Sequence, residues 1–207
     1  MQLMNFRLLF GESEILMAQT RKISLVGFRF AGKTTFGRAL ADEISIRFMD
    51  IDSLIVQSAR KSISEIFKTD GAAYFRLLEE KIIYDTFNSD ISSIIAVGGG
   101  AVSSSKNRKI IKNNSYVVYL DVEESVLLSR YHRLEMQKDE FRPRLTSLSL
   151  EDEVSFLLHQ RKPYYQEIAD LIIPLENALI SENLNVIISK LEKHGPKWLK
   201  NKLANRN

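Results

Sequence analysis

A glycine-rich turn near the start of the chain carries residues that could bind a nucleotide: Gly27-Phe28-Arg29-Phe30-Ala31-Gly32-Lys33-Thr34-Thr35. Its Gly-x4-Gly-Lys-Thr spacing is typical of a phosphate-binding loop, in which backbone N–H groups and a helix N-terminus surround the phosphates. Lys33 would reach the β- and γ-phosphates, and the Thr34 hydroxyl would ligate Mg²⁺. A chance match is the alternative, but an apolar run precedes the turn and apolar residues at helical spacing follow it. The predicted ATP contacts in this turn are Gly27, Phe30, Ala31, Gly32, Lys33, Thr34 and Thr35.

Two acidic residues and a run of glycines follow two further predicted strands. Asp50 and Asp52 close the strand at 46–49, and Gly98-Gly99-Gly100 follows the strand at 91–97. Ligands of open α/β sheets bind at the carboxyl ends of the strands, so both features are expected beside the phosphate loop. On an extended backbone the Asp-x-Asp spacing would turn both carboxylates to one side. One could then organise hydrated Mg²⁺ while the other accepts a proton from a substrate hydroxyl; the alternative is that either acid only caps a helix.

The glycines and three arginines could hold a small anionic substrate. Glycines permit a positive φ and a close approach of substrate to backbone, although a simple loop is the alternative. Arg76 begins a long predicted helix, Arg142 lies in a charged segment, and Arg161 precedes Pro163. Guanidinium groups bind carboxylates and phosphates in bidentate fashion, whereas any single arginine is as well explained as a solvated surface group.

The elements that must position these residues alternate between strand and helix. We predict strands at 22–26, 46–49, 91–97, 116–120 and 171–173, and helices at 34–44, 53–60, 72–86, 123–134, 150–162 and 184–193, with a capping box at Ser62 opening a short helix. This order predicts an α/β fold with a parallel sheet and helices on both faces. Residues 135–149 are predicted to form a mobile loop, Pro163 to end a helix, and 196–207 to be a frayed or loosely docked end.

Composition narrows the class of protein. The chain has 207 residues, 44% hydrophobic and 27% charged, which fits a soluble globular enzyme. It has no cysteine, so disulfides, thiolate metal sites and cysteine nucleophiles are excluded. No apolar run is long enough to span a membrane, and residues 1–20 do not have a signal-peptide pattern, so no membrane partner is predicted. The lack of cysteine together with a nucleotide site favours the cytoplasm, where ATP is abundant. The net charge of +3 is spread along the chain, which favours a phosphate-handling enzyme over a nucleic-acid binder.

Six separated segments together resemble the shikimate kinase family. They are Ile23 to Thr35, Asp50-Ile51-Asp52, Asp70 to Arg76 with Glu79-Glu80, Gly98 to Val102, Arg142-Pro143, and Arg161 to Tyr165. The resemblance covers residues 21–193 and is more specific than the phosphate loop alone. It implies a three-layer P-loop NTPase fold of the nucleoside-monophosphate-kinase type, with a five-stranded parallel sheet, helices on both faces and a mobile lid. It further implies that MgATP phosphorylates the 3-hydroxyl of shikimate in the chorismate and aromatic amino-acid pathway.

The resemblance also implies a role for each matching residue. Asp52 would hold the substrate hydroxyls and act as general base, and Arg76 and Arg161 would clamp the shikimate carboxylate. The implied catalytic residues are Lys33, Asp52 and Arg142, the implied substrate contacts are Asp52, Arg76, Gly98, Gly99, Gly100 and Arg161, and the implied metal ligands are Thr34 and, through water, Asp50. Arg142 would also contact ATP, and Arg130 would pack on the adenine.

Three departures from the family pattern keep other functions open. Phe30 replaces a common glycine, Arg144 replaces an apolar residue after the Arg-Pro pair, and the segment between Arg130 and Arg142 is several residues longer than usual. The alternatives are a catalytically idle paralogue with a binding or regulatory role, or a related small-metabolite kinase such as gluconate kinase. We expect a monomer with an extension at 1–20, a kinase domain at 21–195 that contains a substrate-binding subdomain at 51–86 and a lid at 135–149, and a basic tail at 196–207.

Overall fold

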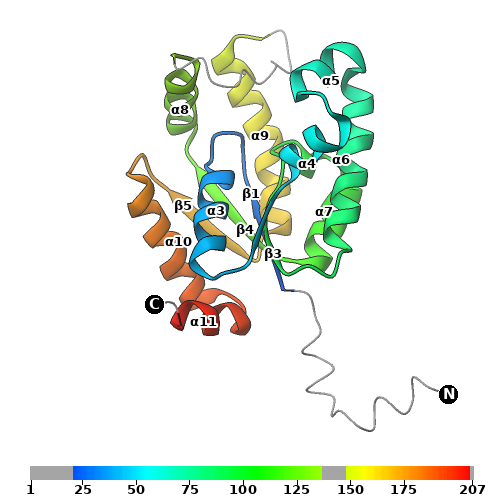
Figure 1. The fold of residues 1–207 in the computed structure, drawn as a ribbon. Coiled ribbons are helices and arrows are strands. Elements are labelled where there is room, and N and C mark those ends of the chain that lie inside the picture. The colour runs from blue at the N-terminus through cyan, green and yellow to red at the C-terminus, as the bar shows by residue number, and fades with distance from the viewer. Residues whose placement is uncertain (1–20, 137–147, 206–207) are drawn as a thin grey trace, which may run out of the picture.

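A parallel sheet forms the centre of the protein (Figure 1). The structure is a computed structural model that describes residues 21–136 and 148–205. The strands are β1 (Lys22–Val26), β2 (Arg47–Asp50), β3 (Ser93–Ala96), β4 (Tyr116–Val122) and β5 (Leu171–Leu175), in the spatial order β2-β3-β1-β4-β5. Every pair of neighbours is parallel, which confirms the predicted five-stranded parallel sheet.

The register of the strands brings the predicted site residues to one edge of the sheet. Ala96 of β3 lies level with both Leu25 of β1 and Asp50 of β2. The phosphate loop after β1, the acidic pair after β2 and the glycine run after β3 therefore leave the sheet side by side. This is the carboxyl edge, where α/β folds bind their ligands.

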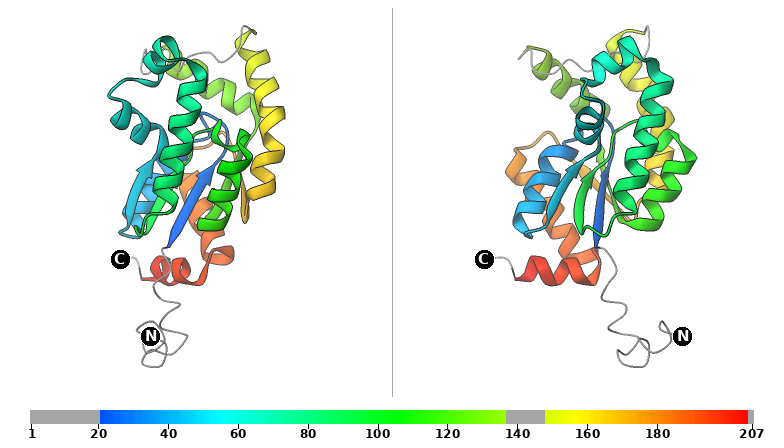
Figure 2. Two further views of the ribbon diagram at one scale, coloured as in Figure 1. Left: turned by 90° about the vertical axis from the view of Figure 1, so that its right-hand side faces the viewer. Right: turned by 45° about the vertical axis from the view of Figure 1, so that its right-hand side comes forward.

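Helices cover both faces of the sheet (Figure 2). They are α3 (Lys33–Glu43), α4 (Ile51–Ala59), α5 (Ile63–Thr69), α6 (Gly71–Phe87), the short 3₁₀ turn η2 (Ala101–Ser103), α7 (Ser105–Asn114), α8 (Glu124–Met136), α9 (Leu150–Ile168), α10 (Ile180–His194) and α11 (Lys197–Ala204). Alternating residues of β4 enter two different hydrophobic clusters, as the two-residue period of a strand requires. One cluster includes side chains of α3, α8, α10 and α11, the other includes side chains of α4 to α7, and α9 contributes to both.

Two helices differ from the prediction because packing overrides a local signal. Helix α9 was expected to stop at Pro163, but it runs on to Ile168. Proline removes one backbone donor there, yet Tyr165 and Ile168 beyond it are buried in the core. The predicted frayed end is also wrong, because Leu199 and Leu203 of α11 are 0% and 1% exposed in the same cluster as α10.

Helix α7 was not predicted. Its sequence, SKNRKIIKNN, contains few apolar residues, so its periodicity is weak. The signal that could have found it is the cap, since the Ser104 hydroxyl accepts a hydrogen bond from the Asn107 N–H. The capping box that was predicted, between Ser62 and Glu65 of α5, is confirmed.

Candidate active site

The phosphate loop adopts a tight turn that requires glycine at both ends. Gly27 has φ 147° and Gly32 has φ 91°, and a Cβ on Gly27 would lie 2.8 Å from the Leu120 carbonyl oxygen. Lys33 Nζ donates hydrogen bonds to the carbonyl oxygens of Gly27 and Phe28, at the start of the turn, at 2.9 and 2.8 Å. The first turn of α3 carries no acidic residue, so the positive end of the helix dipole is left for an anion.

Helix α8 is attached to this loop through Phe30. The Phe30 backbone has φ 67°, in the left-handed region that glycine adopts without cost. Its carbonyl accepts a hydrogen bond from Arg130 Nη1 at 3.0 Å, and its ring packs edge-on against Tyr131 with centroids 5.3 Å apart. Arg130 Nη2 also donates to the Glu176 carbonyl at 3.2 Å. Arg130 therefore lies beside the loop, and a role in packing on adenine remains a prediction.

Asp50 both caps a helix and contacts the loop. Its Oδ1 accepts from the Ser53 N–H at 3.0 Å, which begins α4, and its Oδ2 accepts from the Thr34 hydroxyl at 2.6 Å. A hydroxyl beside a carboxylate is an oxygen donor set that suits Mg²⁺, which binds few protein ligands in addition to phosphates. Among residues 21–136 and 148–205 there is no cluster of acids and histidines that could hold a metal by itself.

Asp52 reaches the glycine run from a helix rather than a strand. The expectation that Asp50 and Asp52 share an extended backbone is wrong, because β2 ends at Asp50 and α4 begins at Ile51. A Cβ on Gly98 would lie 2.8 Å from Asp52 Oδ1. The carboxylate therefore lies against the turn that follows β3, on the side where α4 begins.

Side chains and backbone crowd all three glycines of the run. A Cβ on Gly99 would lie 3.1 Å from the Arg29 backbone nitrogen, and one on Gly100 would lie 2.7 Å from Arg76 Nη2. None of Gly98, Gly99 and Gly100 has a positive φ, so that part of the expectation was wrong. The absence of side chains, rather than unusual dihedral angles, is what this turn requires.

Two arginines lie around this turn with different partners. Arg76 Nη1 pairs with Glu79 Oε2 at 2.5 Å. Burial raises the pKa of Glu79, and the guanidinium of Arg76 offsets part of that rise. Arg161 is 7% exposed, and burial lowers its pKa, with nearby Tyr165 acting in the opposite direction. Within the described residues Arg161 forms no salt bridge, so it is a buried cation with capacity for an anionic ligand.

Sequence reasoning missed the role of Tyr165 in this arrangement. Its hydroxyl donates to the Gly99 carbonyl at 2.5 Å, and its ring stacks on Tyr119 with centroids 5.1 Å apart. Tyr165 is fully buried and follows Arg161 by one helical turn, so the spacing of the two residues was a signal that could have been used. Arg142 and most of the predicted lid, residues 137–147, lie outside the described part of the chain.

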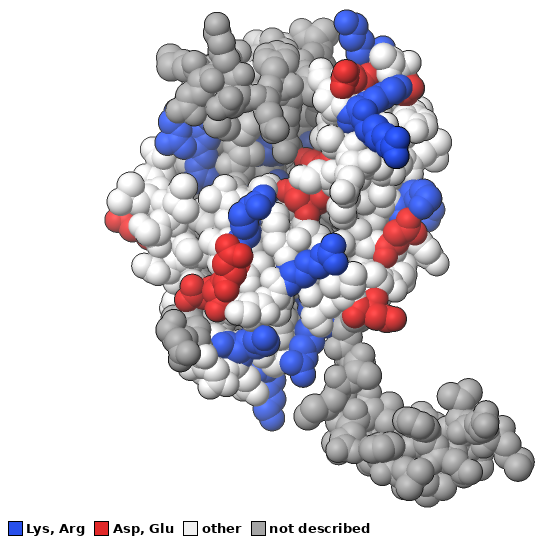
Figure 3. All heavy atoms as spheres, viewed as in Figure 1, with Lys and Arg blue, Asp and Glu red and all other residues white. Residues whose placement is uncertain are grey.

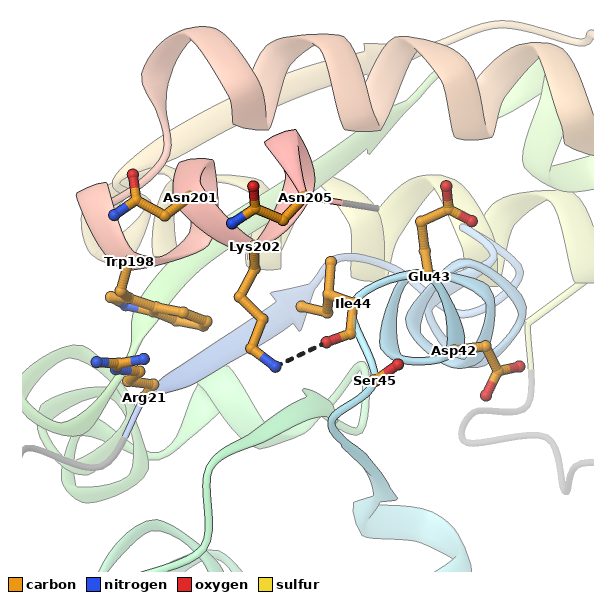
Figure 4. Close-up of a pocket in the computed structure, with 9 residues that line it drawn as sticks. All are labelled: Arg21, Asp42, Glu43, Ile44, Ser45, Trp198, Asn201, Lys202 and Asn205. Carbon is orange, nitrogen blue, oxygen red and sulfur yellow. Dashed lines mark hydrogen bonds between the residues drawn. The ribbon is translucent and has the colours of Figure 1, made fainter. Parts of the chain in front are cut away.

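The described cavity of about 640 Å³ is not part of this arrangement (Figure 4). It lies at the opposite end of β1, where Arg21 stacks on Trp198 and Lys202 Nζ donates to the Ile44 carbonyl. Its walls carry both acidic and basic side chains, and it contains none of the predicted site residues.

Basic and acidic residues are also interspersed over the face drawn in Figure 3, which shows no stripe of one sign. No helix in the described ranges combines the length and apolar character needed to cross a membrane.

Comparisons with known proteins agree with this geometry. The model of the family described as "Shikimate kinase" matches residues 29–192. A shikimate kinase of Alkaliphilus oremlandii is 35% identical over 83% of this chain and 99% of the relative, and one of Xylella fastidiosa is 32% identical over 84% and 93%. The solved structure of shikimate kinase from Acinetobacter baumannii in complex with shikimate is 31% identical, covers 91% of this chain and 98% of its own, and superposes with a TM-score of 0.75. The chain belongs to the shikimate kinase family.

Proposed function

We propose that this protein is an ATP-dependent kinase that transfers the γ-phosphoryl group of ATP to the 3-hydroxyl of shikimate. The observation that carries the proposal is the arrangement at one edge of the sheet. A phosphate loop, the Asp52 carboxylate and the buried cation Arg161, which forms no salt bridge with any described residue, lie around a turn of three glycines. Membership of the family, which includes a relative solved with shikimate, supports the same acceptor.

The acceptor side of the site is proposed to bind a carboxylate and a hydroxyl together. Arg161 and Arg76 would receive the shikimate carboxylate, because guanidinium groups bind that group in bidentate fashion. Asp52 would accept the hydrogen bond, and then the proton, of the attacking hydroxyl. Gly98, Gly99 and Gly100 would border the substrate ring. The segment 51–86, which carries Asp52 and Arg76, would act as the substrate-binding subdomain.

The donor side is proposed to hold ATP through the loop backbone and Lys33. Lys33 Nζ donates hydrogen bonds to two carbonyl oxygens of the loop, and its flexible side chain would let it turn to the β- and γ-phosphates. Arg142 would add a second positive charge, and Arg130 would contact the adenine. Thr34, and Asp50 through water, would hold Mg²⁺, which when bound neutralises charge on the phosphates. The acceptor oxygen forms a bond to γ-phosphorus while the bond to ADP breaks, and the hydroxyl proton passes to Asp52.

Three further proposals follow from the same function. The protein acts as a monomer. It works in the cytoplasm, where ATP is abundant. Its lid at 135–149, carrying Arg142, closes over bound ATP and excludes water.

The acceptor can be tested by measuring ADP release with shikimate or gluconate as the only acceptor. We expect shikimate alone to stimulate release, since Arg76 and Arg161 together suit a ring carboxylate. Stimulation by gluconate alone would instead assign the chain to a related sugar-acid kinase. The Phe30 backbone strain favours one other candidate, an idle paralogue, and calorimetry would identify it by shikimate binding without phosphoryl transfer.

A further inference from the structure

Arg29 and Glu153 form a buried ion pair between the phosphate loop and α9. Arg29 Nη2 donates to Glu153 Oε1, and the two side chains are 8% and 0% exposed. The Arg29 Nε is also buried, and it has no hydrogen-bond partner among the described residues. Burying a charge pair removes two ions from water, a cost that often cancels their attraction. The pair is therefore better explained by the geometry it imposes than by net stability.

The geometry it imposes is the position of one face of α9. Glu153, Arg161 and Tyr165 all lie on the buried side of this helix, spaced by multiples of four residues. Arg161 places its guanidinium 5.9 Å from the centre of the Phe28 ring, and Tyr165 donates to the Gly99 carbonyl. The helix thus contacts the loop and the glycine turn through three side chains along its length. Glu153 is the member of this set nearest the start of α9.

Arg29 also lies close enough to Arg161 to influence it electrostatically. Burial is the main reason that the pKa of Arg161 is lowered, and the positive charges of Arg76 and Arg29 act in the same direction. The Arg29 guanidinium is 5.7 Å from the same Phe28 ring that Arg161 approaches. Glu153 supplies a negative charge beside Arg29. With that charge alone removed, two guanidinium groups around Phe28 would repel one another, so a test of positioning must remove Arg29 together with Glu153.

We propose that the Arg29–Glu153 pair positions Arg161 for the acceptor. It fixes α9 against the phosphate loop and so sets the distance between the acceptor carboxylate and the phosphoryl donor. Arg29 and Glu153 act through Arg161 and are positioning residues, not catalytic ones. The inference rests on the proposed function, because it assumes that Arg161 binds the acceptor carboxylate.

The test uses a variant designed to fold without the charge pair. Arg29→Met/Glu153→Met replaces both ions with apolar side chains, a change that is often neutral for stability. We expect its melting temperature to stay near that of the wild type while the KM for shikimate rises about tenfold, less than the roughly 10²-fold cost that a 1 Å misplacement can have. The KM for ATP should change much less. A shikimate KM equal to that of the wild type in this folded double variant would overturn the proposal.

A second measurement separates positioning from general loosening of the helix. In an Arg161→Lys background the same double replacement should raise the shikimate KM by less than twofold, because residues acting as one unit are not additive. Full additivity of the two effects would contradict action through Arg161. The matched control is Glu167→Gln, which removes the 3.1 Å pair with Arg108 at the other end of α9 and should leave the shikimate KM unchanged. Wild-type protein that fails to use shikimate would refute the proposed function itself, a result distinct from either outcome above.

Discussion

Replacing Phe30 should separate backbone strain from side-chain packing in the phosphate loop. At φ 67° a side chain costs about 1 kcal/mol or more relative to glycine, because Cβ crowds the following carbonyl. The ring offsets part of that cost through the edge-on contact with Tyr131, worth roughly 0.5–1.5 kcal/mol. Phe30→Ala keeps the strain and loses the ring, whereas Phe30→Gly loses both. We therefore expect the glycine variant to be more stable than the alanine variant by about 1 kcal/mol.

Urea unfolding of the two variants measures this difference, provided that the slope with denaturant is unchanged. The control is the same pair of substitutions at Phe156, a half-exposed residue inside α9. In a helix interior the order should reverse, with alanine more stable than glycine by about 1 kcal/mol. A difference in stability between the alanine and glycine variants at position 30 that equals the difference at Phe156 would refute the claim that this backbone is strained.

Four further outcomes are expected. Asp52→Asn should lower kcat by about 10²–10⁴-fold, as loss of a general base does, with ATP binding and the melting temperature nearly unchanged; near-normal kcat would remove Asp52 from the chemistry. Arg161→Lys should mainly raise the shikimate KM, by about tenfold, because an ammonium cannot form the bidentate pair; a change in kcat alone would argue against carboxylate binding. Leu203→Ala should cost about 2–5 kcal/mol in urea unfolding if α11 is part of the core, and a loosely docked end would give almost no loss. Burial raises the pKa of Glu79 above its ordinary 4.5, so the unfolded state releases the carboxyl proton at a lower pH than the folded state does. The free energy of unfolding of the wild type should therefore fall relative to that of Glu79→Gln as pH rises from 4.5 through the folded-state pKa. Parallel pH profiles of the two proteins would contradict the raised pKa.

Local patterns in the sequence were sufficient for the sheet and the phosphate loop. Short apolar runs followed by apolar residues at helical spacing predicted the alternation of strands and helices along the chain. The turn after β1 was identified from its glycines and Lys33. Both signals are local, so no distant part of the chain needed to be known. The same reasoning placed Asp52 and Gly98 to Gly100 at one edge, where the structure brings them together. Arg161 was linked to them only by the resemblance to the family.

Features that depend on distant contacts were not predictable in this way. Helix α9 continues through Pro163 because residues beyond it are buried, and α11 is ordered because Leu199 and Leu203 meet the core. Arg29 and Glu153 are 124 positions apart, and neither belongs to a motif that would suggest pairing. The glycine run was expected to let a substrate approach the backbone closely, but the side chains that lie against it became visible only once α4 and α6 were placed.

The central claim is that Arg161, Asp52 and the phosphate loop together direct phosphoryl transfer to shikimate. Its most direct test is the identity of the product, measured by mass spectrometry after incubation of the protein with ATP, Mg²⁺ and shikimate. We predict one shikimate phosphate for each ADP formed, with the phosphoryl group on the 3-hydroxyl. ADP formation at the same rate without shikimate, or with no phosphorylated shikimate produced, would contradict the account.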